Sequence, residues 1–282
     1  MRNQPLYILT EDLNFFYLLK SELDNYKIPF QILDFDSKIP KIPSIILTTS
    51  NDYKKLTNKN HSNYLVYSKN IDFGKYFLHA IAAVRVGYKE HYTTFTFSID
   101  PGKKLGLMVF LDDYYLDSYC CFETSSFFSI IQKYIDVFED DNPTLLKLNF
   151  KLGRGVLDIT YDLVKQIYIM FQNRKHLRVC LVGEFKSSQF RLSGNSIGKK
   201  FTKDEVSALI LAFRIGIDVR FDNYEYIFEQ LRMKKLFIGK PETKNHETHH
   251  GNFFSLEEVV EKVLTGNLSL SNAIEIISAN NG

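Results

Sequence analysis

An acidic residue stands at the end of an apolar run near the middle of the chain. The stretch Phe95–Asp100 is followed by Pro101-Gly102, and a second apolar run opens at Gly106. This pattern predicts a strand, a tight turn and a returning strand, with the Asp100 carboxylate at the mouth of the first strand. A metal ion and a phosphate can approach such a position together, because little side-chain bulk surrounds it. The alternative is an ordinary hairpin with an Asp-Pro-Gly turn.

Further acids lie at the borders of two later predicted elements. Val179–Val182 predicts a buried strand, and Glu184 stands just past its end. Asp204 and Glu205 open a predicted helix, with Thr202 three residues before Glu205. This spacing is that of a capping box, so these two acids could serve only to start the helix.

Taken together, these segments resemble the RuvC-type Holliday junction resolvases and their YqgF-type relatives in the ribonuclease H superfamily. Ile99-Asp100-Pro101-Gly102 is similar to the first RuvC-type motif, and Asp204 with Ala208 and Ala212 is similar to the last one. The segment from Glu184 to Ser188 resembles an Asp-Glu-Arg-x-Ser/Thr motif of the YqgF-type relatives, with Gly183 and Phe185 departing from it. The resemblance covers about Thr93 to Ile217, somewhat under half of the chain.

The resemblance implies a metal-dependent nuclease that hydrolyses phosphodiester bonds in structured DNA or RNA. Asp100, Glu184 and Asp204 would be its catalytic, metal-binding acids, with Glu205 as a further metal ligand. Converging carboxylates repel one another unless a cation neutralises them, so Mg²⁺ or Mn²⁺ is the expected cofactor. Two such ions roughly 3.5 to 4 Å apart can activate a water and stabilise the leaving oxygen.

Two departures from the RuvC-type pattern keep other functions open. The strand before Gly153 ends without an acid, and Ser207 stands where the last helix of the resolvases has a second acid. They favour a YqgF-like site with three carboxylates over a four-carboxylate resolvase site. They also leave open a non-catalytic nucleic-acid-binding or scaffold protein. A third interpretation is that the segment forms half of a sugar-kinase or actin-type ATPase. This fold would need a second phosphate loop with an acid and glycines, and we find no convincing one in the sequence.

Basic residues and glycines near the predicted strand ends could hold phosphate groups. Gly153 and Gly155 could let backbone approach a phosphate. The basic candidates share predicted loops that follow the strands or lead into the last helix, where they would form a rim for a phosphate backbone. The nucleic-acid-binding candidates are Lys103, Lys104, Lys151, Arg154, Lys186, Arg191 and Lys203.

The predicted elements divide into two α/β series and a helical tail. In residues 1–90, strands are expected at 6–9, 30–33, 44–48 and 64–67, with helices around Leu13 to Leu23 and at 73–86, and a turn at Ser50 to Asp52. In residues 91–222, the order β-β-β-α-β-α-β-α predicts a ribonuclease-H-like mixed sheet. Its strands fall at 94–99, 106–111, 114–122, 145–150 and 177–182, and its helices at 125–138, 156–171 and 204–215. Residues 223–282 are expected to form a helical C-terminal extension, with helices at 224–236, 256–264 and 269–278.

Composition places few constraints on the partner. Three cysteines in 282 residues cannot form a disulfide framework, which favours a reducing compartment. No apolar run reaches the roughly 20 residues of a membrane span, so we expect a cytoplasmic protein without a membrane partner. A net charge of +2 neither favours nor excludes nucleic acid. RuvC-type enzymes act as dimers, so a homodimer is possible. His246, His249 and His250 fit a polar loop better than a metal site.

Overall fold

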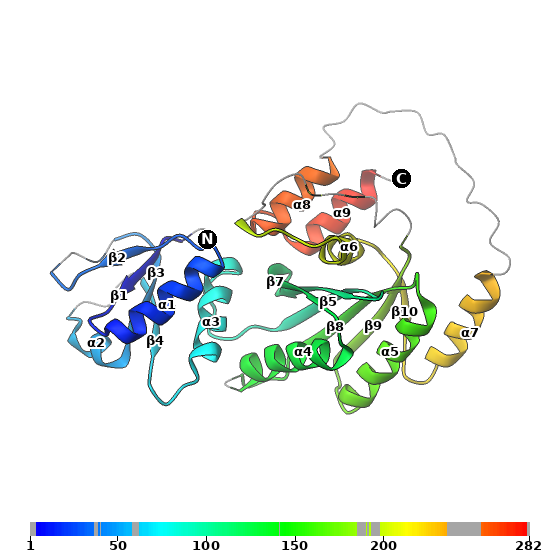
Figure 1. Cartoon of the computed structure of the whole chain (residues 1–282), viewed down its shortest axis with the longest axis horizontal. Helices are drawn as coiled ribbons and strands as arrows, with labels where there is room; N and C mark the ends of the chain where they lie inside the picture. The colour runs from blue at the N-terminus through cyan, green and yellow to red at the C-terminus, as the bar shows by residue number, and fades with distance from the viewer. Residues whose placement is uncertain are drawn as a thin grey trace.

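Two β-sheets organise the chain, whose structure is a computed structural model. The structure describes residues 4–36, 39, 41–57, 62–140, 142–184, 190, 192, 198–235 and 255–280. The first sheet is built from strands within residues 6–67 and the second from strands within residues 94–219, as Figure 1 shows. The protein is therefore of the mixed α/β class.

The N-terminal sheet has four parallel strands in the order β2-β1-β3-β4. Its elements are β1 (Leu6–Leu9), α1 (Leu13–Asn25), β2 (Gln31–Leu33), β3 (Ser44–Thr49), α2 (Ser50–Lys55), β4 (Ser62–Tyr67) and α3 (Phe73–Arg85). The turn predicted at Ser50 to Asp52 is wrong, because the Thr49 hydroxyl accepts from the Asp52 N–H and caps a short helix there. Helix α1 buries Phe15, Leu19 and Leu23, whereas Leu13 is 67% exposed.

The central sheet has six strands in the order β10-β9-β8-β5-β6-β7. The strands are β5 (Thr94–Asp100), β6 (Leu105–Leu111), β7 (Tyr114–Cys121), β8 (Lys147–Gly153), β9 (Leu177–Val182) and β10 (Ile217–Val219). The helices between them are α4 (Thr124–Glu139), α5 (Leu157–Phe171) and α6 (Lys203–Ala212). Strands β5, β6 and β7 are antiparallel neighbours, whereas β8 and β9 run parallel to β5. This order of elements agrees with the predicted one, and the three-residue strand β10 was not predicted.

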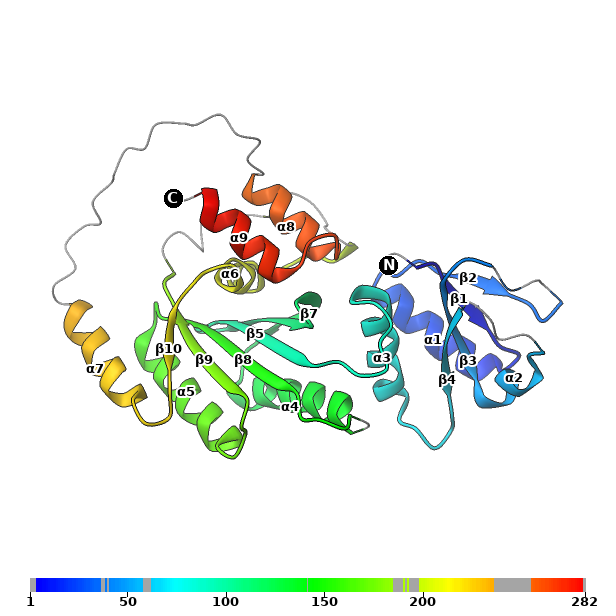
Figure 2. The same ribbon diagram turned by 180° about the vertical axis from the view of Figure 1, so that it is seen from behind.

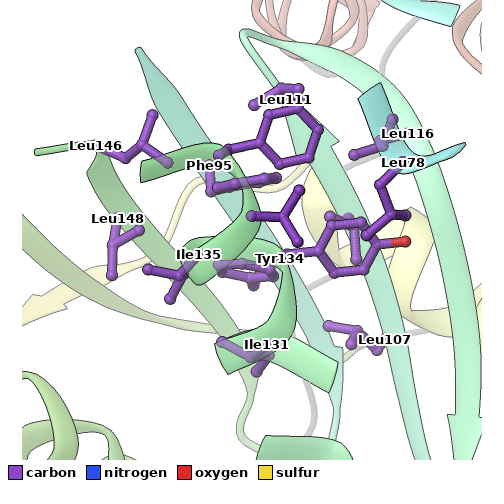
Figure 3. Close-up of a cluster of buried hydrophobic side chains, with 14 of the residues drawn as sticks. Leu78, Phe95, Leu107, Leu111, Leu116, Ile131, Tyr134, Ile135, Leu146 and Leu148 are labelled. Atoms are coloured by element: carbon purple, nitrogen blue, oxygen red, sulfur yellow. The ribbon is translucent and has the colours of Figure 1, made fainter. Parts of the chain in front are cut away.

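Helices cover both faces of the central sheet. Figure 1 shows α4 and α5 on one face and α6 on the other. The core under α4 joins side chains of the sheet with Ile131, Tyr134 and Ile135, and Leu78 of α3 reaches the same cluster (Figure 3). Because buried residues of the N-terminal elements (β1 to α3) and of the central sheet share this cluster, these two parts of the described chain pack against each other.

The three C-terminal helices pack on the central sheet and its helices. They are α7 (Tyr224–Lys235), α8 (Leu256–Leu264) and α9 (Leu270–Asn280). Phe228 of α7 contacts Tyr161 of α5, with ring centroids 5.3 Å apart. Val260 and Val263 of α8 share a second core cluster with Leu209 of α6. The predicted helices are thus present, and they bury the outer side of the sheet's own helices (Figures 1 and 2).

Within the described ranges, none of the helices combines the length and the apolar character needed to cross a bilayer.

Candidate active site

Asp100 is the last residue of β5 and lies opposite Gly106 of β6. Its carboxyl group is largely buried beneath the start of α6, where the Ser207 side chain hydrogen-bonds to it. Burial, followed by the negative charges of Glu184 and Asp204, raises the pKa of Asp100 to about 7, and the Ser207 hydrogen bond and the Lys203 charge oppose this shift. The charges of Glu184 and Asp204 therefore both act on Asp100 at the carboxyl end of β5.

Helix α6 begins directly on strand β6, and a glycine makes this close approach possible. A Cβ atom at Gly106 would lie 2.1 Å from the backbone oxygen of Asp204. Thr202 and Glu205 form the predicted capping box at the start of α6. The Asp204 carboxylate also lies 3.6 Å from the Cys120 sulfur, measured from Oδ2 to Sγ. The close contact at Gly106 thus brings Asp204 to the strand end that carries Asp100.

Glu184 follows β9 and is held by the loop after β8. The Gly155 N–H donates to Glu184 Oε1 at 2.7 Å. A Cβ atom at Gly153 or Gly155 would come within 2.2 Å of a Glu184 carboxylate oxygen. These glycines were expected to make room for a phosphate, but the structure fills that room with the Glu184 carboxylate.

The three carboxylates provide the oxygen donors that a divalent cation prefers, but their positions do not form a binding site for one. An all-oxygen donor set is what Mg²⁺ and Mn²⁺ prefer. Across the described ranges, however, no three His, Cys, Asp or Glu side chains lie close enough together to hold a metal ion. The charges of Glu184 and Asp204 reach Asp100, but the three groups do not form one cage in this arrangement, where Gly155 binds Glu184.

The Glu205 carboxylate is buried and is already hydrogen-bonded to neighbouring groups. Its side chain is 4% exposed, and its oxygens accept from Ser118 Oγ at 2.8 Å and from the Thr202 N–H at 2.8 Å. Lys199 Nζ lies 3.1 Å from Glu205 Oε1 and 3.6 Å from Asp117 Oδ1. Although burial raises the pKa of Glu205, the Thr202 N–H and the Lys199 charge lower it below its usual value. Its carboxylate is thus occupied by contacts that hold the start of α6.

The hydrogen-bond network around Glu205 extends through Asp117 to helix α1. The Asp117 carboxylate accepts from the hydroxyls of Tyr26, Tyr119 and Tyr134 at 3.0, 2.9 and 3.1 Å. Tyr26 belongs to the end of α1, so a buried acid of β7 joins this helix to the central sheet. The sequence did not reveal this network, because Asp117 and Lys199 are far apart in the chain and neither lies in a recognisable motif.

Replacing Lys199 with Met is expected to lower the free energy of unfolding by about 2 kcal/mol, because two buried carboxylates lose their cationic partner. Urea unfolding at pH 7 measures this loss. Lys200→Met is the matched control, since Lys200 is the exposed neighbour and should tolerate the change within about 0.5 kcal/mol. Equal midpoints for the two variants would show that Lys199 does not hold the network together.

The basic candidates that the structure describes have different surroundings. Lys203 opens α6, close enough for its charge to act on Asp100. Lys103 lines a groove of about 650 Å³ beside Phe122, and the Lys104 ammonium lies 4.5 Å above the Phe122 ring. Arg154 lies beside Gly183, and a Cβ atom there would be 3.7 Å from its guanidinium.

Lys151 was expected in a loop, and this prediction is wrong. It lies within β8, because the strand continues to Gly153, and its ammonium donates to the backbone oxygen of Ala212. Lys186 and Arg191, and likewise His246, His249 and His250, lie outside the described residues.

The contribution of Asp100 to the stability of the metal-free protein should fall as pH rises, because Asp100 binds its proton more tightly in the folded state. Its folded pKa is about 7, against 3.8 for an ordinary Asp. The resulting stabilisation is complete below pH 3.8 and is lost as pH rises through about 7. Asp100→Asn should therefore unfold with the wild-type free energy near pH 4 and be more stable by a few kcal/mol at pH 8 in EDTA. Urea titrations across this range measure the difference, and a constant difference would contradict the pKa shift.

Comparison with known proteins leaves the family open. No protein-family model and no curated protein matches the chain. Among solved structures, a crystal structure of Aa-Ago with externally bound siRNA aligns with 64% of this chain at 11% sequence identity and a TM-score of 0.22. The alignment covers 35% of that protein, so the chain spans about a third of its length. A likeness this weak assigns neither fold nor function.

Proposed function

We propose that this protein is a metal-dependent nuclease, RuvC- or YqgF-like, that hydrolyses phosphodiester bonds in structured nucleic acid on a ribonuclease-H-like central sheet. One observation carries the proposal. Asp100 ends a buried strand beside Glu184 and Asp204, and burial together with their charges raises its pKa to about 7. Perturbed carboxylates of this kind gather at functional sites, because charge repulsion in a buried position is costly without a compensating ligand.

The order of the central sheet supports this choice of chemistry. Strands β5, β8 and β9 are parallel, so Asp100, the glycine-rich loop after β8 and Glu184 meet at one edge. Bound Mg²⁺ or Mn²⁺ would supply an activated water and stabilise the leaving oxygen. Asp100, Glu184 and Asp204 would hold the ion, and Lys203 would attract the phosphate backbone. Glu205 has no part in this proposal, because its oxygens already bind Ser118, Lys199 and the backbone.

Assembly of the site requires Glu184 to exchange partners. Its carboxylate now accepts from the Gly155 N–H at 2.7 Å. A divalent cation at Asp100 would offer this carboxylate a stronger partner than one backbone N–H group, since two opposite full charges attract each other more strongly than a carboxylate attracts an N–H dipole. The Glu184 side chain would have to move from the glycine loop toward β5. Glu184 follows β9, and β8 is the one strand between β9 and β5 in the sheet.

A nucleic-acid-binding protein without catalysis is the second candidate. Ser207, which stands where resolvases have an acid, hydrogen-bonds to Asp100, and the described acids do not form a ready metal cage. Both features would be expected of a site that keeps its fold after losing cleavage. DNA or RNA would remain the partner, and self-association stays a prediction.

The decisive experiment is an assay of the full chain against labelled four-way junction, duplex and single-stranded DNA and RNA, with Mg²⁺, with Mn²⁺ and with EDTA. The nuclease proposal expects cleavage of at least one substrate that depends on the divalent ion. Salt-sensitive binding without cleavage in any condition would support the second candidate. Neither cleavage nor binding would overturn both.

A further inference from the structure

A cavity with polar and apolar lining residues lies near the C-terminal end of α6, whereas the three carboxylates lie near its N-terminal end. It measures about 300 Å³ and is lined by strands of the central sheet and by α9. Strands β5, β8 and β9 form its floor, and the segment after α6 closes one side. Since α6 has 10 residues, it separates this cavity from Asp100 by about 15 Å, at about 1.5 Å per residue.

Lys151 projects into this cavity from β8 with most of its hydrogen-bonding capacity unused. One of its three N–H groups donates to the backbone oxygen of Ala212, the last residue of α6. Across the described ranges this is its one hydrogen-bond partner. Burial lowers the pKa of Lys151 to about 8, which means that the folded chain stabilises this ammonium poorly. Capping of α6 explains one N–H group, and the other two remain available.

Two arginines add positive charge to the same cavity. Arg178 lines it and binds Asp218 through Nε and Nη2, at 2.9 and 3.2 Å. Arg214 also lines it and donates to the backbone oxygen of Gly183. Asp113 is the one acid among the described lining residues, and its carboxylate accepts from the Ser271 hydroxyl. The lining therefore carries three positive charges and one negative charge, and Asp218, which lies outside the lining, opposes the charge of Arg178.

The remaining lining residues suit an organic group attached to an anion. Ile215, Leu270 and Ile274 provide apolar surface, and Thr96 and Asn149 provide polar groups on the floor. Ligand pockets typically combine apolar walls with a few polar groups that fix orientation, and about 300 Å³ is the lower end of their usual volume. A bare inorganic ion would leave most of this space unfilled.

We propose that this cavity binds a phosphomonoester of nucleotide size, with Lys151, Arg178 and Arg214 around the phosphate and the organic group against Ile215 and α9. Guanidinium and ammonium groups together match a phosphate dianion, which offers three acceptor oxygens. The ligand is either a free nucleotide or the phosphorylated end of a strand. The proposal stands independently of the nuclease function, because it uses none of the three carboxylates.

Calorimetric titration of the full chain with adenosine and uridine 5′-monophosphates tests the proposal, with the two nucleosides as controls without phosphate. Lys151→Met should weaken nucleotide binding at least about tenfold, the scale of one charge-assisted hydrogen bond. Lys147→Met is the matched control, since Lys147 is exposed on the same strand and should bind as wild type. Arg178→Gln provides a second variant in case Lys151→Met does not fold. Asp100→Asn should bind normally, which separates this cavity from the carboxylate site.

Oligonucleotides with a 5′-phosphate or a 5′-hydroxyl distinguish the two sources of the phosphate. Binding of the phosphorylated oligonucleotide alone would identify a strand end, and binding of the mononucleotides would identify a free nucleotide. The proposal is overturned if nucleosides bind as tightly as nucleotides, if Lys147→Met loses as much affinity as Lys151→Met, or if no phosphomonoester binds at millimolar concentration.

Discussion

Replacing Asp100 with Asn is expected to reduce divalent-ion-dependent cleavage on the order of 10³-fold or more. The amide keeps the shape of the side chain and removes the charge that a cation would bind. Metal stabilisation of developing charge contributes several kcal/mol to such reactions, and each 1.36 kcal/mol corresponds to a tenfold change in rate. Single-turnover cleavage of the best substrate, at saturating Mg²⁺ and matched protein concentration, measures the effect.

The control for this variant is Asp136→Asn, which removes an exposed acid from α4 and should cleave at the wild-type rate. Nucleic-acid binding in EDTA should be equal in the wild type and in Asp100→Asn, because the carboxylate is not expected to contact the bases. Cleavage at the wild-type rate by Asp100→Asn would remove Asp100 from the active site. Equal loss in both variants would point to a general effect of charge instead.

The sequence predicted the elements around Asp100 well, because each of them has a strong local signal. The alternating Phe and Ile residues before Asp100 and the Pro-Gly turn after it define the hairpin of β5 and β6. The bounds of β9, Leu177–Val182, were predicted to the residue, because Val179–Val182 is an apolar run that Gly183 ends. Thr202 and Glu205 marked the start of α6 to within one residue.

Where the sequence prediction failed, a contact between distant segments decides the structure. Lys151 was placed in a loop because the predicted strand ended at Phe150, yet the strand continues to Gly153 and Ala212, at the end of α6, accepts a hydrogen bond from the Lys151 ammonium. Gly153 and Gly155 suggested a phosphate loop, but Glu184 from the next strand fills the space they leave. Neither pairing follows from a local pattern. The first depends on how α6 packs on the sheet, and the second on the pairing of β9 with β8.

Glu205 shows how one motif can carry two meanings. Two adjacent acids at a helix start could both be metal ligands, or one could be a cap. The structure separates them through side-chain direction, because the Glu205 carboxylate turns back to the Thr202 N–H and Ser118, whereas the charge of Asp204 acts on Asp100. The capping box therefore supports the candidate site indirectly, by fixing where Asp204 begins the helix.

Gly106→Ala should show how far the site depends on the close approach of α6 to β6. The added methyl group would lie 2.1 Å from the backbone oxygen and 2.4 Å from the backbone carbon of Asp204. Because these atoms belong to the backbone, the start of α6 would have to move away from the sheet. We expect a loss of about 3 kcal/mol in the free energy of unfolding, at the upper end for one overpacked methyl group, and a large loss of cleavage as Asp204 leaves Asp100.

Gly183→Ala is the matched control for this variant, since among the described residues its added methyl group would meet only the Arg154 guanidinium, at ordinary contact distances of 3.7 and 3.9 Å. It should change the free energy of unfolding by less than about 0.5 kcal/mol. Urea unfolding and the pH titration of Asp100 provide two readouts. If Gly106→Ala separates Asp204 from Asp100, the pKa of Asp100 should fall, because one of the negative charges that raise it has moved away. A stable Gly106→Ala protein with an unchanged Asp100 pKa would mean that α6 does not begin against β6, and the three-carboxylate site would lose its geometric basis.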